Sequence, residues 1–531
     1  MAHLSPAQKI ALNKYSLPYY TAQNIRLETG DKFLFENHEY LIGIYADTHP
    51  HIVIQKSTQM GASTYAFIRA VHGCQHFYKL GVGYFFPTAT DVQDFSKTRI
   101  TPFLKYNKHI TITDVSDGLD TDNVGVKRVG NTYMYLRGMR TDIGVKSIPL
   151  DLVIFDELDE AEPQAREKAL HRRDHSDYKH ALELSNPTLE NYGINKQFLE
   201  SDQKYYLIKC GHCGHWTSLD DGFPNCLQEQ KDGHVLRLCG KCKRELDIHG
   251  PGEWVPKARG NKAMSGYLIS QLYSHYIDPK VILQEFKTKR GSDLETFYRM
   301  RLGRAYTLAE NKIEKQQVLS LTSKQELKQP KSQYAYLGVD QGSDLHCVII
   351  YSDGERTYLK KAFVLTDFED IDKVIEDEGI RCGVIDALPE TRKAKELKDR
   401  NKGLVFLNYY VEGAKGNYKW DEEKGIVQTD RTESLDFSQH PLTTCTLVLY
   451  NSIIDLPDFA QHCANIARKL VENEQTGGKK YTWVKTGPDH YRHALNYAFI
   501  ARSRYSADVP MDEARESFDS TPNSTASEGS W

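Results

Sequence analysis

The chain of 531 residues lacks several features that mark common protein classes. It has no apolar run of membrane-spanning length, which argues against a membrane protein. It has no charged segment followed by an apolar one at its start, so we expect a protein of the reducing cytosol rather than a secreted one. Its formal net charge is only −4. Without a global basic field, any polyanionic partner must be held by local clusters of charge. Internal repeats are also absent.

The length predicts about three or four domains of ordinary size. Ten cysteines are present. In a reducing compartment, paired cysteines are more often metal ligands than disulfides.

One segment is similar to a phosphate-binding loop with a displaced lysine. The sequence QKSTQMGAST, Gln55 to Thr64, follows an apolar strand and precedes a stretch with helical periodicity. The usual loop has its lysine directly after the last glycine, but here Gly61 is followed by alanine. Lys56 is long enough to fold back toward the β- and γ-phosphates of a nucleotide, and Ser63 or Thr64 would supply a hydroxyl to Mg²⁺. On the residues alone, an ordinary polar turn is an equally good interpretation.

A second segment, DLVIFDELDE, reads as a buried strand that ends in two acids. At such a position Asp156 would hold the Mg²⁺ shell and Glu157 would polarise the attacking water. The simpler alternative is a helix start. Strands that alternate with helices predict a mostly parallel sheet with helices on both faces, and ligands bind beyond the carboxyl ends of its strands.

Four cysteines form two C-x-x-C pairs, in CGHC and CGKC. The glycines allow backbone N–H groups to turn toward the sulfurs, which suits tetrahedral Zn²⁺. We therefore predict a structural zinc ribbon held by Cys210, Cys213, Cys239 and Cys242. Cys226, His212 and His215 are weaker candidates. The basic tip of the ribbon would either contact DNA or be a solvated surface.

Three carboxylates are suitably placed in the last part of the chain. Asp340 lies in the strand YLGVDQG, Asp386 ends CGVIDA, and Asp489 opens a predicted helix. Two strand ends and one helix start can converge on two divalent ions that activate water for phosphodiester cleavage. An isolated aspartate at a strand end is more often a turn or a cap. We expect His490 and His493 to cover the helix surface rather than face the acids.

In motif order the chain resembles the large terminase subunits of tailed bacteriophages, close to the lambda-like group. Those motors also have a Walker A loop with the lysine at its start, as in QKSTQMGAST, and a Walker B strand that ends in Asp-Glu. The resemblance spans roughly residues 35 to 505 and implies that the loop is a working variant. The nucleotide would be bound by Gln55, Lys56, Ser57, Gly61, Ala62, Ser63, Thr64 and Asp156, with Glu157 as the catalytic residue.

Further roles follow from the same resemblance. Ser185, in SNP, matches the coupling motif of the family. Arg137 and Arg140 lie where the family places arginines that reach a γ-phosphate; the alternative for either is a surface charge, which the residues alone favour. Asp340, Asp386 and Asp489 match the metal ligands of its ribonuclease H-like nuclease. The acid that completes this site stays open among Asp344, Asp430, Glu433 and Asp436.

The fold class implied is α/β: a P-loop ATPase of the RecA/ASCE-like type with a parallel sheet, an inserted zinc ribbon and a ribonuclease H-like nuclease domain. The expected boundaries are 1–203 for the N-terminal segment and ATPase core, 204–256 for the ribbon, 257–332 for a helical lid and linker, 333–505 for the nuclease and 506–531 for a disordered tail.

The function implied is ATP-driven packaging of double-stranded DNA into a procapsid, with metal-dependent cutting of concatemeric DNA. The cofactors would be ATP, Mg²⁺ (or Mn²⁺ at the nuclease) and structural Zn²⁺. Partners would be DNA, the portal protein, a small terminase subunit and further copies in a ring, in the cytoplasm of the infected host and not in the mature virion. The alternative is a helicase-like remodelling ATPase whose nuclease-like domain is inert.

Overall fold

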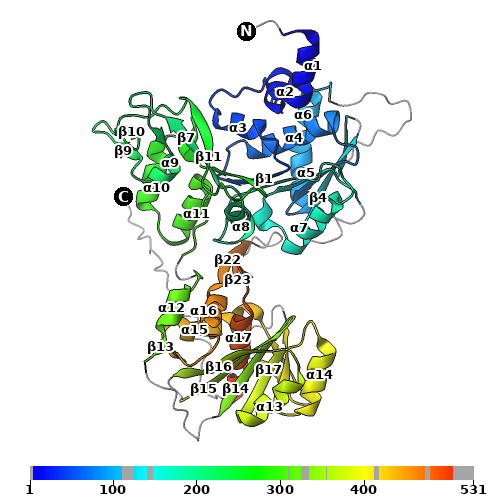
Figure 1. The fold of residues 1–531 in the computed structure, drawn as a ribbon, viewed down its shortest axis with the longest axis vertical. Coiled ribbons are helices and arrows are strands. Elements are labelled where there is room, and N and C mark those ends of the chain that lie inside the picture. Colours follow the sequence, from blue (N-terminus) through cyan, green and yellow to red (C-terminus); the bar gives the residue numbers. More distant parts are fainter. Residues whose placement is uncertain are drawn as a thin grey trace, which may run out of the picture. The chain divides into compact units, whose positions relative to one another are not determined.

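The computed structural model divides the chain into two compact units, residues 1–308 and 309–531 (Figure 1). It describes residues 4–110, 125–130, 132–139, 148–308, 311–324, 334–353, 356–411, 418–472 and 479–505. The predicted tail, 506–531, and the end of the predicted lid and linker region, 325–332, therefore lie outside the described residues. Across the described ranges, no helix combines the length and the apolar character needed to cross a bilayer.

The first unit is built on a ten-stranded sheet. Nine strands follow the order β11-β7-β12-β1-β6-β5-β2-β4-β3, and β8 pairs with β7. The strands are β1 (His51–Lys56), β2 (Val82–Phe86), β3 (Val126–Val129), β4 (Thr132–Gly138), β5 (Leu152–Asp156), β6 (His180–Ser185), β7 (Lys204–Lys209), β8 (Trp216–Thr217), β11 (Gly252–Pro256) and β12 (Ser265–Ile269). The central run from β12 to β4 is parallel. The predicted parallel-rich α/β fold is confirmed for this unit.

The central strands are nearly all apolar because both faces of this sheet are covered. One core contains residues of α2, α3 and α4, and a separate core contains residues of α7 and α8 on the other face. The helices of this unit are α1 (Pro6–Tyr15), α2 (Leu17–Asn24), α3 (Tyr40–Ala46), α4 (Ala62–His76), α5 (Ala89–Phe95), α6 (Thr101–Tyr106), α7 (Pro163–Leu170), α8 (Gly193–Glu200), α9 (Leu219–Gly222), α10 (Pro279–Thr288) and α11 (Gly291–Leu302).

The predicted boundaries at residues 204 and 257 differ from the structure. The cysteine-rich segment begins in β7 and ends in β11, which are strands of the main sheet, and between them lies a small hairpin of β9 (Leu227–Glu229) and β10 (Val235–Arg237). The expected lid region contains β12, which pairs with the phosphate-loop strand β1 along five residues. Strand β12 is short, and the helical periodicity after it dominates the sequence pattern.

The second unit contains a nine-stranded mixed sheet in the order β13-β21-β16-β15-β14-β17-β18-β20-β19. Its strands are β13 (Thr322–Ser323), β14 (Ala335–Gln341), β15 (Leu345–Ser352), β16 (Thr357–Leu365), β17 (Ile380–Asp386), β18 (Val405–Tyr410), β19 (Lys419–Asp421), β20 (Ile426–Thr429) and β21 (Leu447–Tyr450). Strands β14, β15 and β16 are antiparallel neighbours, whereas β17 and β18 run parallel to β14. A separate hairpin joins β22 (Ile466–Glu472) and β23 (Lys479–Lys485).

Helices cover both faces of this second sheet, as Figure 1 shows. On one face lie α13 (Glu369–Asp377) and α14 (Thr391–Arg400), and on the other lie α16 (Leu456–Ala464) and α17 (His490–Ser503). The remaining helices are α12 (Lys315–Ser320) and α15 (Arg431–Thr443). A Cβ atom on Gly338 of β14 would lie 1.9 Å from the carbonyl oxygen of Ala494. Only glycine therefore lets α17 lie this close to the central strand.

Candidate active sites and metal centre

The loop after β1 has the backbone of a phosphate site. Gly61 adopts a left-handed conformation with φ of 77°, and α4 begins at the next residue. No side chain caps α4, and its first intrahelical hydrogen bond runs from the N–H of Tyr65 to Gly61. The first N–H groups of this 15-residue helix are thus available to an anion, which the helix dipole also favours.

Lys56, the last residue of β1, points across the sheet to the Walker B strand. Its Nζ atom donates to Oε1 of Glu157 at 2.6 Å and to Oδ1 of Asn186 at 3.3 Å. The Lys56 side chain is buried. The reach of Lys56 toward the phosphates of a nucleotide stays a prediction.

Asp156 ends β5 and shares its carboxylate between two hydroxyls. Oδ1 accepts from Ser63 at 3.2 Å, and Oδ2 accepts from Tyr84 at 2.8 Å. Burial, followed by the neighbouring charge of Glu157, raises the pKa of Asp156 to about 6. A carboxylate and a hydroxyl at hydrogen-bond distance are the oxygen donors that Mg²⁺ uses beside a nucleotide, so the donor set fits that ion.

Glu157 has a strained backbone, with φ of 60° and ψ of 54°. Few residues other than glycine adopt this conformation, and such strain concentrates at functional sites. Its Oε2 atom accepts from the Ser185 hydroxyl and from the Asn186 backbone N–H, both at 3.3 Å. The carboxylate is therefore fixed between the phosphate-loop lysine and the predicted coupling motif.

Strand order explains this convergence. Strand β6 lies between β1 and β5, and it pairs with both in parallel register. Its last residue, Ser185, therefore stands between Lys56 and Asp156. The N–H of Asp159 also donates to the Ser185 hydroxyl at 3.2 Å, which connects the residues after Walker B to the same point.

The other predicted nucleotide residues are placed less directly. Gln55 is buried and bridges Gly303 and Asn195, so its contacts are structural. Ser57 is fully buried, and Ala62, Ser63 and Thr64 form the first turn of α4. Arg137 binds the carbonyl oxygens of Gly125 and Leu136. Arg140 lies outside the described residues.

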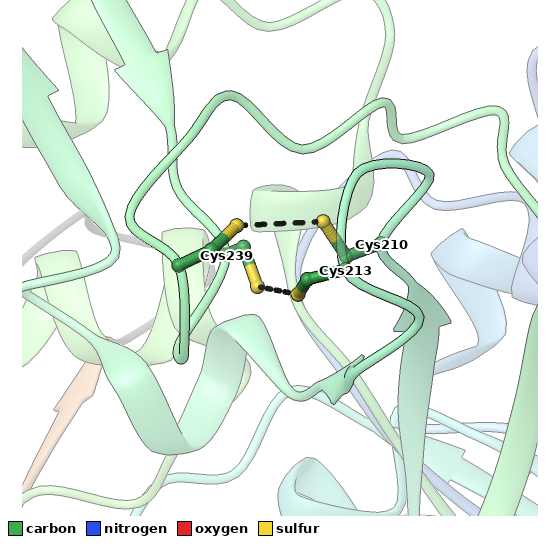
Figure 2. A group of neighbouring side chains, drawn as sticks. Cys210, Cys213 and Cys239 are labelled. Atoms are coloured by element: carbon green, nitrogen blue, oxygen red, sulfur yellow. Dashed lines mark hydrogen bonds between the residues drawn. The ribbon is translucent and has the colours of Figure 1, made fainter.

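The four predicted cysteines meet in one cluster, drawn in Figure 2. Their sulfurs all lie within 4.8 Å of one another, with 3.8 Å between Cys210 and Cys242 and 3.7 Å between Cys213 and Cys239. Zn–S bonds of about 2.3 Å place tetrahedral sulfurs about 3.8 Å apart, so the cluster has the size of a zinc site. Cys226, His212 and His215 are not part of it.

The predicted nuclease acids come from adjacent strands. Strands β14 and β17 are paired in parallel up to Val339 and Ile385, so Asp340 and Asp386 follow at neighbouring positions. Tyr497 of α17 donates to Oδ2 of Asp386 at 2.9 Å, which places this carboxylate on the α17 face. Burial raises the pKa of Asp386, and the charge of Asp340 adds to the effect.

Asp489 directly precedes α17, and two histidines in the first turns of this helix contact the predicted nuclease acids. His490 binds Oδ2 of Asp340 through Nδ1 at 2.9 Å, and this hydrogen bond raises the pKa of the imidazole. His493 contacts Asp489 at 3.4 Å. The expectation that both histidines merely cover the helix is wrong. The first turn of α17 faces the sheet end, so positions 490 and 493 face the acids.

The three acids are not as close together as the cysteines. Among the described residues, the four cysteines are the only group of three or more potential metal ligands within 4.8 Å of one another. Of the acids left open for completing the site, Asp430 caps α15 through the N–H groups of Thr432 and Glu433. Asp436 accepts from the Trp483 indole at 2.7 Å. Asp344 is half-buried beside the end of β14.

Two histidines near this site were not anticipated from the sequence. His346 stacks on His490 with 4.6 Å between ring centroids, and His462 lies 5.6 Å from His346. His346 is directly opposite Asp340 in the antiparallel pair of β14 and β15. The alternation of HCVIIYS places His346 on one face of the strand, but only the pairing register brings it to Asp340.

The parallel sheet, the loop with its basic side chain and the acidic strand end together define an ATPase of the P-loop type. Residues 41–254, less than half of the chain, match the family model of the phage terminase large subunit gpA, ATPase domain. The recognition of a phage large terminase from the sequence is confirmed. No curated protein matches the chain significantly.

Solved structures give weaker similarities. The large terminase of a thermophilic bacteriophage in complex with ADP is 12% identical, with a TM-score of 0.32, and 89% of this chain and 99% of that one are covered. The ATPase domain of the Thermus phage P74-26 large terminase is 14% identical, with a TM-score of 0.31 and coverage of 51% and 97%. The human cytomegalovirus terminase nuclease domain is 9% identical, with a TM-score of 0.22 and coverage of 35% and 92%. At these scores the similarities carry no argument about this chain.

Proposed function

We propose that this protein is a DNA-packaging motor that hydrolyses ATP in its first unit and cuts DNA in its second. The observation that carries the ATPase half is the network of Lys56, Glu157 and Ser185, inside the segment that matches a terminase ATPase family. The packaging partners would be double-stranded DNA, a portal protein on a procapsid and a small terminase subunit, with several copies in a ring.

In ATP hydrolysis, water attacks the γ-phosphorus while the bond to the leaving ADP oxygen breaks, and Glu157 accepts the proton from the water. Lys56 and the first N–H groups of α4 bind the phosphates, and Ser63 with Asp156 would hold Mg²⁺, which neutralises phosphate charge. Glu157 currently binds Lys56. Phosphates that attract the lysine would release the carboxylate to bind water.

We propose further that Asp340, Asp386 and Asp489 hold divalent ions for phosphodiester cleavage in a ribonuclease H-like domain. This proposal is supported by their positions at two adjacent strand ends and at the start of a helix on the same face. Mg²⁺ or Mn²⁺ would activate the attacking water and stabilise the leaving oxygen. The four-cysteine cluster would hold a structural Zn²⁺.

The ATPase is tested with a Glu157→Gln variant, which keeps the size and hydrogen bonding of the side chain but cannot accept the proton. We expect it to bind ATP with near-parental affinity and to hydrolyse it at least about 100-fold more slowly, as expected for loss of a general base. Parental turnover would remove Glu157 from the chemistry. A protein without any nucleotide response would overturn the ATPase as a whole.

The nuclease is tested by plasmid cleavage in Mg²⁺ or Mn²⁺ with the parent, Asp340→Ala and Asp386→Ala. The matched control is Asp372→Asn, which alters a half-buried acid of the same unit that pairs with Arg400 instead. We expect both alanine variants to lose cleavage while ATP turnover and the control stay active. Intact plasmid with active ATPase in the parent would favour the remodelling ATPase with an inert nuclease-like domain.

A further inference from the structure

Arg299 stands out among the arginines around the phosphate loop because most of its guanidinium is unused. It lies in the last turn of α11 and donates only through Nε, to the carbonyl oxygen of Pro187 at 3.1 Å. In the part of the chain that the structure describes, its two terminal nitrogens have no hydrogen-bond or ion-pair partner. A half-buried guanidinium with two free N–H₂ groups is prepared for an anion.

The other arginines near the loop are already engaged. Arg301 forms a bidentate pair with Glu285 at 2.7 and 3.1 Å and also binds Gln271. Arg304 donates to the backbone of Asp220 and lies 3.7 Å from its carboxylate. Arg137, the candidate from the sequence, is bound to two backbone carbonyls of its own hairpin.

The segment that carries Arg299 is packed directly on the phosphate loop. The N–H of Thr58 donates to the carbonyl oxygen of Met300 at 3.0 Å, and a Cβ on Gly303 would lie 2.6 Å from the backbone nitrogen of Ser57. Asn186 connects both sides, because its Nδ2 donates to the carbonyl oxygens of Lys56 at 2.9 Å and Arg299 at 3.4 Å. The backbone of Arg299 is therefore one side chain, that of Asn186, away from Lys56, and Asn186 also contacts Glu157.

We propose that Arg299 binds the γ-phosphate of ATP from within the same subunit and transmits its presence to the coupling motif. This inference rests on the proposed ATP hydrolysis and adds a residue to it. The free terminal nitrogens form the fork that matches two phosphate oxygens, while Nε stays on Pro187. A phosphate that binds the fork would pull on the Ser185–Pro187 segment, whereas ADP, which lacks the γ-phosphate, would not.

The test compares the parent with three variants, Arg299→Ala, Arg299→Lys and Arg290→Ala. For each protein, calorimetry gives the affinities for Mg²⁺–ATPγS and Mg²⁺–ADP, and a turnover assay gives the kcat for ATP. Arg290 begins the same helix about 14 Å away and binds only local carbonyls, so it is the matched control. We expect Arg299→Ala to lower kcat by about 10³-fold, the lower range for an arginine at a γ-phosphate. Arg299→Ala should also lower the affinity for ATPγS at least about tenfold while leaving the affinity for ADP unchanged.

Lysine at position 299 should not restore kcat, because a point charge cannot hold Pro187 and two phosphate oxygens together. An equal loss of affinity for both nucleotides, or parental kcat in Arg299→Ala, would overturn the proposal and assign Arg299 a structural role. A parent that binds neither nucleotide would instead refute the proposed ATPase itself. Thermal unfolding at the parental midpoint shows that each variant is folded.

Discussion

In the proposed ATPase, the nucleotide chemistry depends on Lys56. It is buried, and its Nζ atom contacts Glu157 and Asn186. We expect Lys56→Ala to abolish measurable ATP turnover, since it removes the phosphate ligand and leaves Glu157 without its ion-pair partner. Metal-dependent plasmid cleavage should persist, because the proposed nuclease acids lie in the other unit. Unchanged ATP turnover would remove Lys56 from the loop chemistry.

Glu183 makes a pH-dependent contribution to stability in the interior of the first unit. It is fully buried on β6 and accepts from Arg166 at 2.9 and 2.7 Å and from His51 at 2.7 Å. Burial alone would raise the pKa of this carboxyl, but Arg166 and His51 outweigh burial and lower it from 4.5 to about 2. The depressed pKa adds stability above pH 4.5, which is lost as the pH falls toward 2.

We expect Arg166→Met to reduce the free energy of unfolding at pH 7 by about 3–5 kcal/mol, because an uncompensated buried charge remains. Replacing both residues, as Arg166→Met with Glu183→Leu, should recover most of that loss. Urea unfolding of the three proteins at pH 7 and pH 4 measures both effects. A double variant as unstable as the single one would show that packing, not charge, holds this site.

At the level of single residues, the sequence is sufficient to predict candidate site residues when the residues of a motif are close together in the sequence. The displaced lysine, the Asp-Glu pair and the four cysteines are recognisable because their neighbours in sequence carry the pattern. His346 and Arg299 are not, because their proximity to the sites comes from strand register and from the return of α11 to the loop. His490 was recognised but interpreted wrongly, since helical spacing alone does not show which face is covered.

At the level of elements, the contact between α17 and β14 determines the geometry of the predicted nuclease site. Gly338 allows it, because a Cβ there would meet backbone atoms of Ala494 and Ala498 at 1.9 and 2.3 Å. We expect Gly338→Ala to displace α17, to cost about 1–3 kcal/mol of stability as overpacking does, and to abolish cleavage.

Gly383, on the neighbouring strand β17, is the matched control. A Cβ there meets only side chains at 3.6 Å or more, which is ordinary contact. Gly383→Ala should therefore keep both stability and plasmid cleavage. If the two variants behave alike, close approach of α17 is not what positions Asp489 and His490.

The strands also show which elements the sequence could predict. Strands β1, β2 and β5 are continuous apolar runs that lead into the motifs, and all three were expected from the sequence. Strand β12 was not expected from the sequence. Its five residues lie between polar segments, and they form a strand by pairing with β1. The helical periodicity beyond it suggested a lid where the structure continues the sheet.

At the level of the whole molecule, the two units have separate hydrophobic cores. The cysteine module belongs to the first, because Cys210, Cys239 and Leu246 are part of the same core cluster as Ile52 and Ile54 of β1. We expect about one Zn²⁺ per purified chain. Chelating this ion should lower the midpoint temperature of the unfolding transition of the first unit, measured by calorimetry. The transition of the second unit should not move.

Cys210→Ser should reproduce the effect of the chelator, and Cys226→Ser, outside the cluster, is its control. A protein purified without zinc, or a chelator that shifts neither transition, would refute the metal assignment. Loss of both transitions together would show that the units unfold as one.

The placement of β7 and β11 in the main sheet has a consequence for how this module can be exchanged or deleted. A ribbon inserted in a loop could be deleted without removing any strand of the main sheet. Removing residues 204–256 here would delete β11 and β7, the two strands beyond β12, and turn β12 into an open edge beside β1. Open edges pair with other chains, so such a truncation would aggregate rather than reveal a minimal motor.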